Sequence, residues 1–81
     1  MELRKRQAKI LQDLFEKKRI SVDAILDEYG ISKRTLYYDL NKINDWLSED
    51  NFGMANIEDK EIVIEIANLA GMEKQMHRGK E

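Results

Sequence analysis

The sequence predicts a mainly α domain of three helices followed by a small β-hairpin. Apolar residues recur at spacings of three and four along residues 2–18 and again along residues 32–47, which is the period of a helix with one buried face. Gly30 separates two helical stretches, and Ser32 follows as a capping residue for the second. Isoleucine alternates along residues 61–66, as in a strand with one buried side.

Composition excludes most catalytic chemistry. The chain has 81 residues, no cysteine, no proline and a single histidine, His77. Such a chain forms one domain with a modest core and no roomy cleft. It cannot form a disulfide or a thiolate nucleophile, and one histidine cannot supply a Ser-His-Asp triad or a multi-histidine metal site. We therefore expect no enzyme, no cofactor, no metal and no small-molecule ligand.

The amino terminus is charged and is followed by no long apolar run. A secretory signal needs an apolar stretch after its basic residues, and a spanning helix needs about 20 apolar residues. The sequence therefore predicts a cytoplasmic protein without membrane contact.

The first helix is predicted over residues 2–18, and a short extended stretch follows at residues 19–21. Ser21 can cap a second helix, which is expected to run to about Tyr29. Gly30 ends that helix, because glycine adopts the left-handed conformation without a steric penalty. The expected buried residues of the two helices are Leu3, Ile10, Leu11, Leu14, Phe15, Val22, Ile25 and Leu26.

The third helix is predicted over about residues 32–47, with Ser32 as its cap. Its buried stripe consists of Leu36, Leu40, Ile43 and Leu47. The side chains on or beside its outer face are Lys33, Arg34, Tyr37, Tyr38, Asn41 and Lys42. Two helices joined by a tight turn, with basic, aromatic and amide groups exposed on the second, are typical of a helix-turn-helix.

Residues 54–58 and 61–66 are predicted strands, because β-branched residues are concentrated there. Residues 58–61 form the expected turn of the hairpin, and Trp46 is expected to pack between helix and hairpin. Three helices followed by such a hairpin make a winged helix-turn-helix.

The expected domain organisation is one winged helix-turn-helix domain over residues 1–66 and a linker or tail over residues 67–81. Periodicity fades in the tail, where Met72 and Met76 are the expected apolar contacts.

Net charge is −2, which by itself argues against binding of nucleic acid. The charges are segregated, however. Residues 1–20 contain seven Lys or Arg and three Asp or Glu, whereas residues 21–50 contain three and seven. The face on which each cation lies therefore matters more than the total.

The predicted ligand is double-stranded DNA, since the first turns of the second helix of a helix-turn-helix enter the major groove. Ser32 and nearby N–H groups suit a phosphate oxygen, and Lys33 does so as a point charge. Arg34 can donate two parallel hydrogen bonds to guanine, and Asn41 can pair with adenine. The full set of expected DNA-binding residues is Ser32, Lys33, Arg34, Thr35, Tyr37, Tyr38, Asn41 and Lys42.

Asp39 lies within this basic stretch and would repel phosphate. We therefore expect a structural role for it, with an ion pair or hydrogen bond to Arg34 or Lys42 on the same helix.

The stretch ISKRTLYYDLNKINDWL resembles the recognition helix of bacterial winged-helix regulators. The matching positions are Ser32, Arg34, Thr35, Leu36, Asp39, Leu40 and Ile43. The chain is most similar to the amino-terminal domains of sugar-phosphotransferase-responsive activators of the Mga-like and PTS-regulation-domain (PRD) families, and more distantly to DeoR and biotin-repressor types. This resemblance implies a DNA-binding module of a bacterial transcriptional regulator, with Arg34, Tyr37 and Tyr38 facing DNA. It also implies that the tail over residues 67–81 leads toward regulatory domains outside this chain, and that dimerisation occurs through such regions.

Two other interpretations stay open. A winged helix can serve protein–protein contact, which the acidic balance and the two tyrosines permit. The chain could also be the non-catalytic repressor domain of a biotin ligase.

Overall fold

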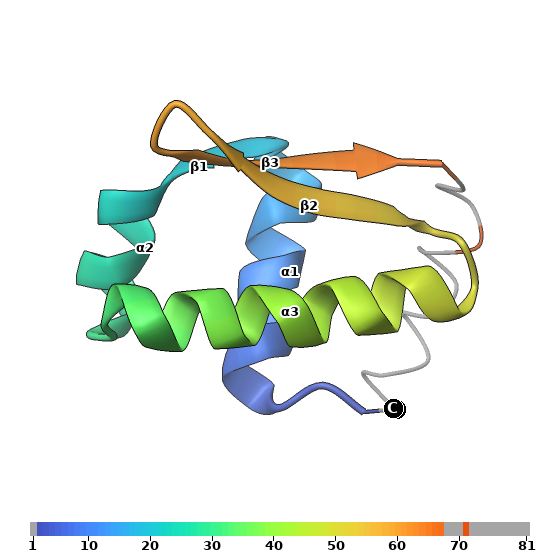
Figure 1. The fold of residues 1–81 in the computed structure, drawn as a ribbon, viewed down its shortest axis with the longest axis horizontal. Coiled ribbons are helices and arrows are strands. Elements are labelled where there is room, and N and C mark those ends of the chain that lie inside the picture. The colour runs from blue at the N-terminus through green and yellow to red at the C-terminus, as the bar shows by residue number, and fades with distance from the viewer. Residues whose placement is uncertain (1, 68–70, 72–81) are drawn as a thin grey trace.

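The computed structural model describes residues 2–67 and residue 71. Its elements, in chain order, are α1 (Lys5–Lys17), β1 (Arg19–Ser21), α2 (Val22–Tyr29), α3 (Lys33–Glu49), β2 (Gly53–Glu58) and β3 (Glu61–Ile66). Figure 1 shows the helices on one side of a small antiparallel sheet whose strand order is β1-β3-β2. The predicted fold class, three helices with a hairpin wing, is confirmed. Met72, Met76 and His77 of the expected tail lie outside the described residues.

Helix α1 begins later than predicted. Arg4 is extended, with φ −68° and ψ 160°, and the helix starts at Lys5 rather than at residue 2. The backbone N–H of Arg4 donates to Oε1 of Gln7 at 3.0 Å, which closes the first turn. Leu3 packs against the core from outside the helix. The apolar pattern alone therefore placed the start too early.

The capping residues of the next two helices are confirmed. The hydroxyl of Ser21 accepts from the N–H of Ala24, and Gly30 ends α2 in the left-handed conformation, with φ 61°. A Cβ at Gly30 would meet nothing within 4 Å, so glycine is favoured here by backbone conformation and not by lack of space. The hydroxyl of Ser32 accepts from the N–H of Thr35 at 3.2 Å and opens α3.

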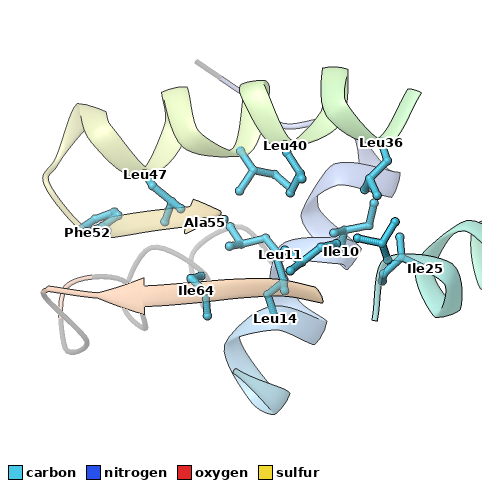
Figure 2. Packing of buried hydrophobic residues seen from close by; sticks show 13 residues of the cluster. Ile10, Leu11, Leu14, Ile25, Leu36, Leu40, Leu47, Phe52, Ala55 and Ile64 are labelled. Atoms are coloured by element: carbon cyan, nitrogen blue, oxygen red, sulfur yellow. The ribbon is translucent and has the colours of Figure 1, made fainter. Parts of the chain in front are cut away.

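One apolar core joins the helices to the inner face of the sheet, as Figure 2 shows. Its buried members are Ile10, Leu11, Leu14, Val22, Ile25, Leu36, Leu40, Ile43, Leu47, Phe52, Ala55, Ile62 and Ile64. Leu26, which was expected to be buried, is only partly covered and packs at the edge of this cluster. Trp46 packs against this cluster, as the expected packing role requires, and its ring lies 5.4 Å from that of Phe52, in the loop before β2.

The sheet has one strand more than the predicted hairpin. Strands β2 and β3 pair as predicted, with Glu58 opposite Glu61 at the turn. The short stretch at residues 19–21 also pairs with β3. Both turn residues, Asp59 and Lys60, have positive φ values of 49° and 65°, which is the signature of a turn that matches the strand twist. In the part of the chain that the structure describes, no helix is both long and apolar enough to cross a membrane.

Candidate nucleic-acid interface

The predicted DNA-binding side chains gather on the first half of α3. Because a helix turns by about 100° per residue, Arg34, Tyr38 and Lys42 follow one another along the outward side. The side chains of this surface, here called the α3 face, are Lys33, Arg34, Tyr37, Tyr38, Asn41 and Lys42. All except Lys42 are exposed, and Lys42 is half-buried. The structure thus brings these predicted residues together on one solvent-facing surface.

The two tyrosines of the α3 face are unusually exposed for large rings. Tyr37 and Tyr38 each keep 49% of their surface accessible. The ammonium of Lys42 lies over the ring of Tyr38, 5.5 Å from its centroid, which is within the range of a cation–π contact. This contact holds a positive charge and a flat ring together on the outward side.

The cations at the start of α3 have no acidic partner. Lys33 and Arg34 form no ion pair with a carboxylate among residues 2–67. Their charges therefore stay available to an external anion.

The first turn of α3 also presents free backbone donors. The N–H of Thr35 is bonded to the Ser32 hydroxyl, which also bonds the Thr35 hydroxyl at 3.1 Å. The N–H of Leu36 donates to the Ser32 carbonyl. The N–H groups of Lys33 and Arg34 have no partner in the described part of the chain. These two groups can donate to a phosphate oxygen, and so can whichever of the Ser32 and Thr35 hydroxyls does not donate to the other.

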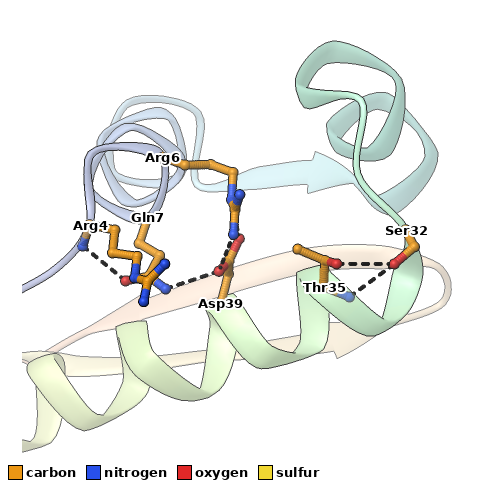
Figure 3. Close-up of polar contacts among 6 residues, drawn as sticks. All are labelled: Arg4, Arg6, Gln7, Ser32, Thr35 and Asp39. Carbon is orange, nitrogen blue, oxygen red and sulfur yellow. Dashed lines mark hydrogen bonds and ion pairs between the residues drawn. The ribbon is translucent and has the colours of Figure 1, made fainter.

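Asp39 has the structural role expected of it, but the predicted partners are wrong. Its side chain is fully buried against α1. Arg6 donates from Nε to Oδ2 at 2.7 Å and from Nη2 to Oδ1 at 3.0 Å, and Gln7 donates from Nε2 to Oδ1 at 2.9 Å. Figure 3 shows both donors reaching the carboxylate from α1. Arg34 and Lys42 point outward while Asp39 points to α1, so a pair within α3 does not form.

The same contacts set the charge of Asp39. Burial acts to raise the pKa of this carboxyl group, but the hydrogen bonds from Arg6 and Gln7 and the positive charges of Arg6 and Arg4 hold the pKa below its usual value. Asp39 is therefore ionised at neutral pH, and its charge is matched by Arg6. A carboxylate in the middle of the basic stretch is in this way kept off the α3 face.

Asn44 fixes α3 to the wing, a role that sequence reasoning missed. Its Nδ2 donates to the carbonyl of Ala55 at 2.9 Å, and its Oδ1 accepts from the N–H of Ala55 at 2.8 Å. Ala55 lies in β2, which is an edge strand. The amide thus pairs both backbone groups of Ala55 at the open edge and links α3 to the hairpin. No signal in one sequence indicates a contact between these two residues.

A second polar link joins α1 to α2. The hydroxyl of Tyr29 donates to Oδ2 of Asp13 at 2.8 Å. Burial and the adjacent Asp13 carboxylate raise the pKa of Tyr29, so the phenol keeps its proton and its role as donor. The carboxyl-terminal end of α2, just before the turn at Gly30, is therefore fixed to α1 by this bond.

The wing differs in charge from the α3 face. Its turn contains Glu58, Asp59 and Glu61 beside a single cation, Lys60, and Glu61 pairs with Arg19 at 2.8 Å. Because this turn is acidic, the wing offers a phosphate oxygen little attraction.

Among the described residues, no group of three or more His, Cys, Asp or Glu side chains could hold a metal ion.

A comparison with known families identifies a helix-turn-helix domain over most of the chain. Residues 2–58 match the helix-turn-helix domain of the M protein trans-acting positive regulator (MGA). This range runs from the segment before α1 to the end of β2. No curated protein and no solved structure matches the chain significantly.

Proposed function

Because the chain belongs to the MGA helix-turn-helix domain family, we propose that it binds double-stranded DNA with sequence preference, with α3 in the major groove. The family makes the chain the DNA-binding module of a transcriptional regulator, which is not catalytic. The observation that carries the proposal is the α3 face itself. Two cations without acidic partners, two exposed rings and an amide lie together there, while the only carboxylate among them is buried and paired.

The side chains of the α3 face differ in what they can recognise. Lys33 supplies a point charge and suits phosphate, whereas the planar fork of Arg34 matches O6 and N7 of guanine. Asn41 can pair with adenine, and Tyr37 and Tyr38 can reach phosphate or pack on a thymine methyl. In this assignment, Lys33 gives affinity for any duplex and Arg34 gives preference among duplexes.

A single small domain makes few phosphate contacts, and two half-sites about one helical turn apart require a dimer. We infer that dimerisation comes from regions outside this chain and that the protein acts in the bacterial cytoplasm, where its operator is. Control by the sugar phosphotransferase system, which the resemblance of the α3 stretch implies, stays a prediction.

The test compares four proteins in competition binding at fixed salt: the wild-type chain, Lys33→Ala, Arg34→Ala and Arg34→Lys. The specific duplex is one selected from random sequences, and the competitor is random duplex. Lys33→Ala should weaken binding to both and lower the log–log salt slope by about one. Arg34→Ala should cost about 1–3 kcal/mol on the selected site and much less on random DNA. Arg34→Lys should restore little, because the fork is lost while the charge remains.

A matched control is Lys17→Ala, since Lys17 is also an exposed lysine but lies at the far end of α1. It should leave binding unchanged. Equal losses on both duplexes for Arg34→Ala would make Arg34 a phosphate contact. If Lys33→Ala and Arg34→Ala both bind DNA as well as the wild type, the DNA-binding surface is not on α3, and a protein-contact role is favoured.

A further inference from the structure

Arg6 is held in place by Asp39 with part of its guanidinium left over. Its Nε and Nη2 atoms both donate to the carboxylate, whereas Nη1 has no partner among the described residues. The side chain remains 38% accessible. A guanidinium fixed along one edge and open along the other has little conformational freedom left to lose when it binds an anion.

A second cation lies near the same carboxylate. Arg4 is exposed, forms no ion pair with a carboxylate in the described part of the chain, and lies close enough for its charge to act on Asp39. Two arginines thus lie beside one buried anion, so the surface above it is positive. Figure 3 shows Arg4 and Arg6 on either side of Gln7 at the start of α1.

This cluster and the wing lie on opposite sides of α3. In Figure 1 the sheet is on one side of α3, and the first turn of α1 emerges on the other. A helix in the major groove has a phosphate strand along each of its sides. The wing side is acidic around Glu58, Asp59 and Glu61, so the α1 side is the one that can attract a phosphate strand.

We propose that Arg4 and Arg6 form a phosphate-binding site for the DNA strand that flanks α3 on the side of α1. Asp39 is its positioning residue, because it holds the Arg6 guanidinium through Nε and Nη2 and leaves Nη1 without a partner among the described residues. The proposal rests on the proposed function, since it needs α3 in the major groove. It places the second backbone contact of this module on α1 and not on the wing.

Arg4 is the residue to test, because Arg6 also supports the fold through Asp39. The experiment measures the affinity of the full chain for a short random-sequence duplex over a series of salt concentrations. The variants are Arg4→Gln, Arg4→Lys and, as matched controls, Lys17→Gln and the wing variant Lys60→Gln. Each Gln variant removes one positive charge from an exposed side chain.

Arg4→Gln should lower the log–log salt slope by about 0.9, which is the loss of one phosphate contact. Between about 50 mM and about 200 mM salt, its affinity should therefore fall about threefold less than that of the wild type. Arg4→Lys should restore the slope, because phosphate requires charge and not a fork. Both control variants should keep the wild-type slope, and ethylation interference should lose one phosphate in Arg4→Gln alone.

The outcomes separate the two proposals. If Lys33→Ala and Arg34→Ala weaken binding but Arg4→Gln keeps the wild-type slope, the α1 site is refuted and DNA binding by α3 stands. A loss of slope in Lys60→Gln but not in Arg4→Gln would place the contact on the wing instead. If the wild-type chain binds no duplex at low salt, both proposals fall.

Discussion

The ion pair between buried Asp39 and half-exposed Arg6 predicts that the two partners differ in their importance for stability. Arg6→Gln leaves a fully buried carboxylate without its positive partner and with only neutral amide donors, such as Gln7, beside it. Removing one partner of a buried pair costs about 3–5 kcal/mol when the other charge stays uncompensated. Asp39→Asn instead leaves Arg6, which is 38% accessible and can turn to water, so only hydrogen bonds are lost, at about 1–3 kcal/mol. Arg6→Gln should therefore be the more damaging change.

The pH dependence of the free energy of unfolding shows whether the uncompensated charge of Asp39 causes the loss of stability in these variants. In the wild type the pKa of Asp39 in the folded state is lowered. Its contribution to stability is therefore present above the unfolded-state pKa of about 3.9 and is lost as pH falls through the folded-state pKa. In Arg6→Gln burial dominates and the folded pKa rises above the unfolded value. The penalty of Arg6→Gln should then be largest at about pH 7 and shrink toward about pH 4, whereas that of Asp39→Asn should change little over this range.

Urea unfolding, followed by circular dichroism at several pH values, measures these penalties. A stabilising osmolyte at constant concentration keeps the weaker variant folded. The assigned role of Arg6 is refuted if Asp39→Asn loses as much free energy of unfolding as Arg6→Gln at neutral pH, or if the loss in Arg6→Gln does not depend on pH.

Three further substitutions test the packing, the helix–wing link and the wing turn. Leu40→Ala should cost about 2–5 kcal/mol, because Leu40 is 6% accessible within the core; an unchanged melting temperature would remove it from the core. Asn44→Ala should cost about 1–3 kcal/mol by leaving both backbone groups of Ala55 unpaired, and Asn44→Asp, which keeps only the acceptor, should recover less than half of that in chemical denaturation. Lys60→Gly should stabilise the chain by up to about 1 kcal/mol, because Lys60 has a positive φ of 65° and an Asp-Gly turn suits this geometry; a lower denaturation midpoint would contradict the assigned turn.

Local signals predicted local structure well. Gly30 and Ser32 act on backbone groups within a few residues of themselves, so their roles at the ends of α2 and α3 could be inferred from the sequence. The apolar stripe of α3 was predictable for the same reason, since helical spacing alone puts it on one face. Pairing of residues 19–21 with β3 was not predictable. A three-residue strand carries no period, and its partner lies about forty residues away in the chain.

The polar contacts that position α3 show more clearly what the sequence alone does not predict. Rules for neighbours on a helix suggested Arg34 or Lys42 for Asp39, whereas its partners are 32 and 33 residues away on α1. Asn44 looked like one more polar residue on the helix, because nothing in the chain marks the edge strand it serves. Residue types of the α3 face could thus be read from the sequence. The contacts that hold the face in place required the three-dimensional arrangement.

The distribution of charge along α3 reconciles a net charge of −2 with the proposed DNA contact. The cations of α3, Lys33, Arg34 and Lys42, lie within the first ten of its 17 residues. Asp45 lies exposed on the outward side one turn after Lys42. The positive end of the helix dipole lies at the same end as the cations. Phosphate is therefore attracted to the first turns and repelled from the last ones, so the helix should enter the groove by its amino-terminal half. The acidic wing adds to the same gradient, and the cations at the start of α1 extend the positive region on the opposite side. What decides the binding of DNA in this chain is the placement of its 14 cations, not their excess over its 16 acids.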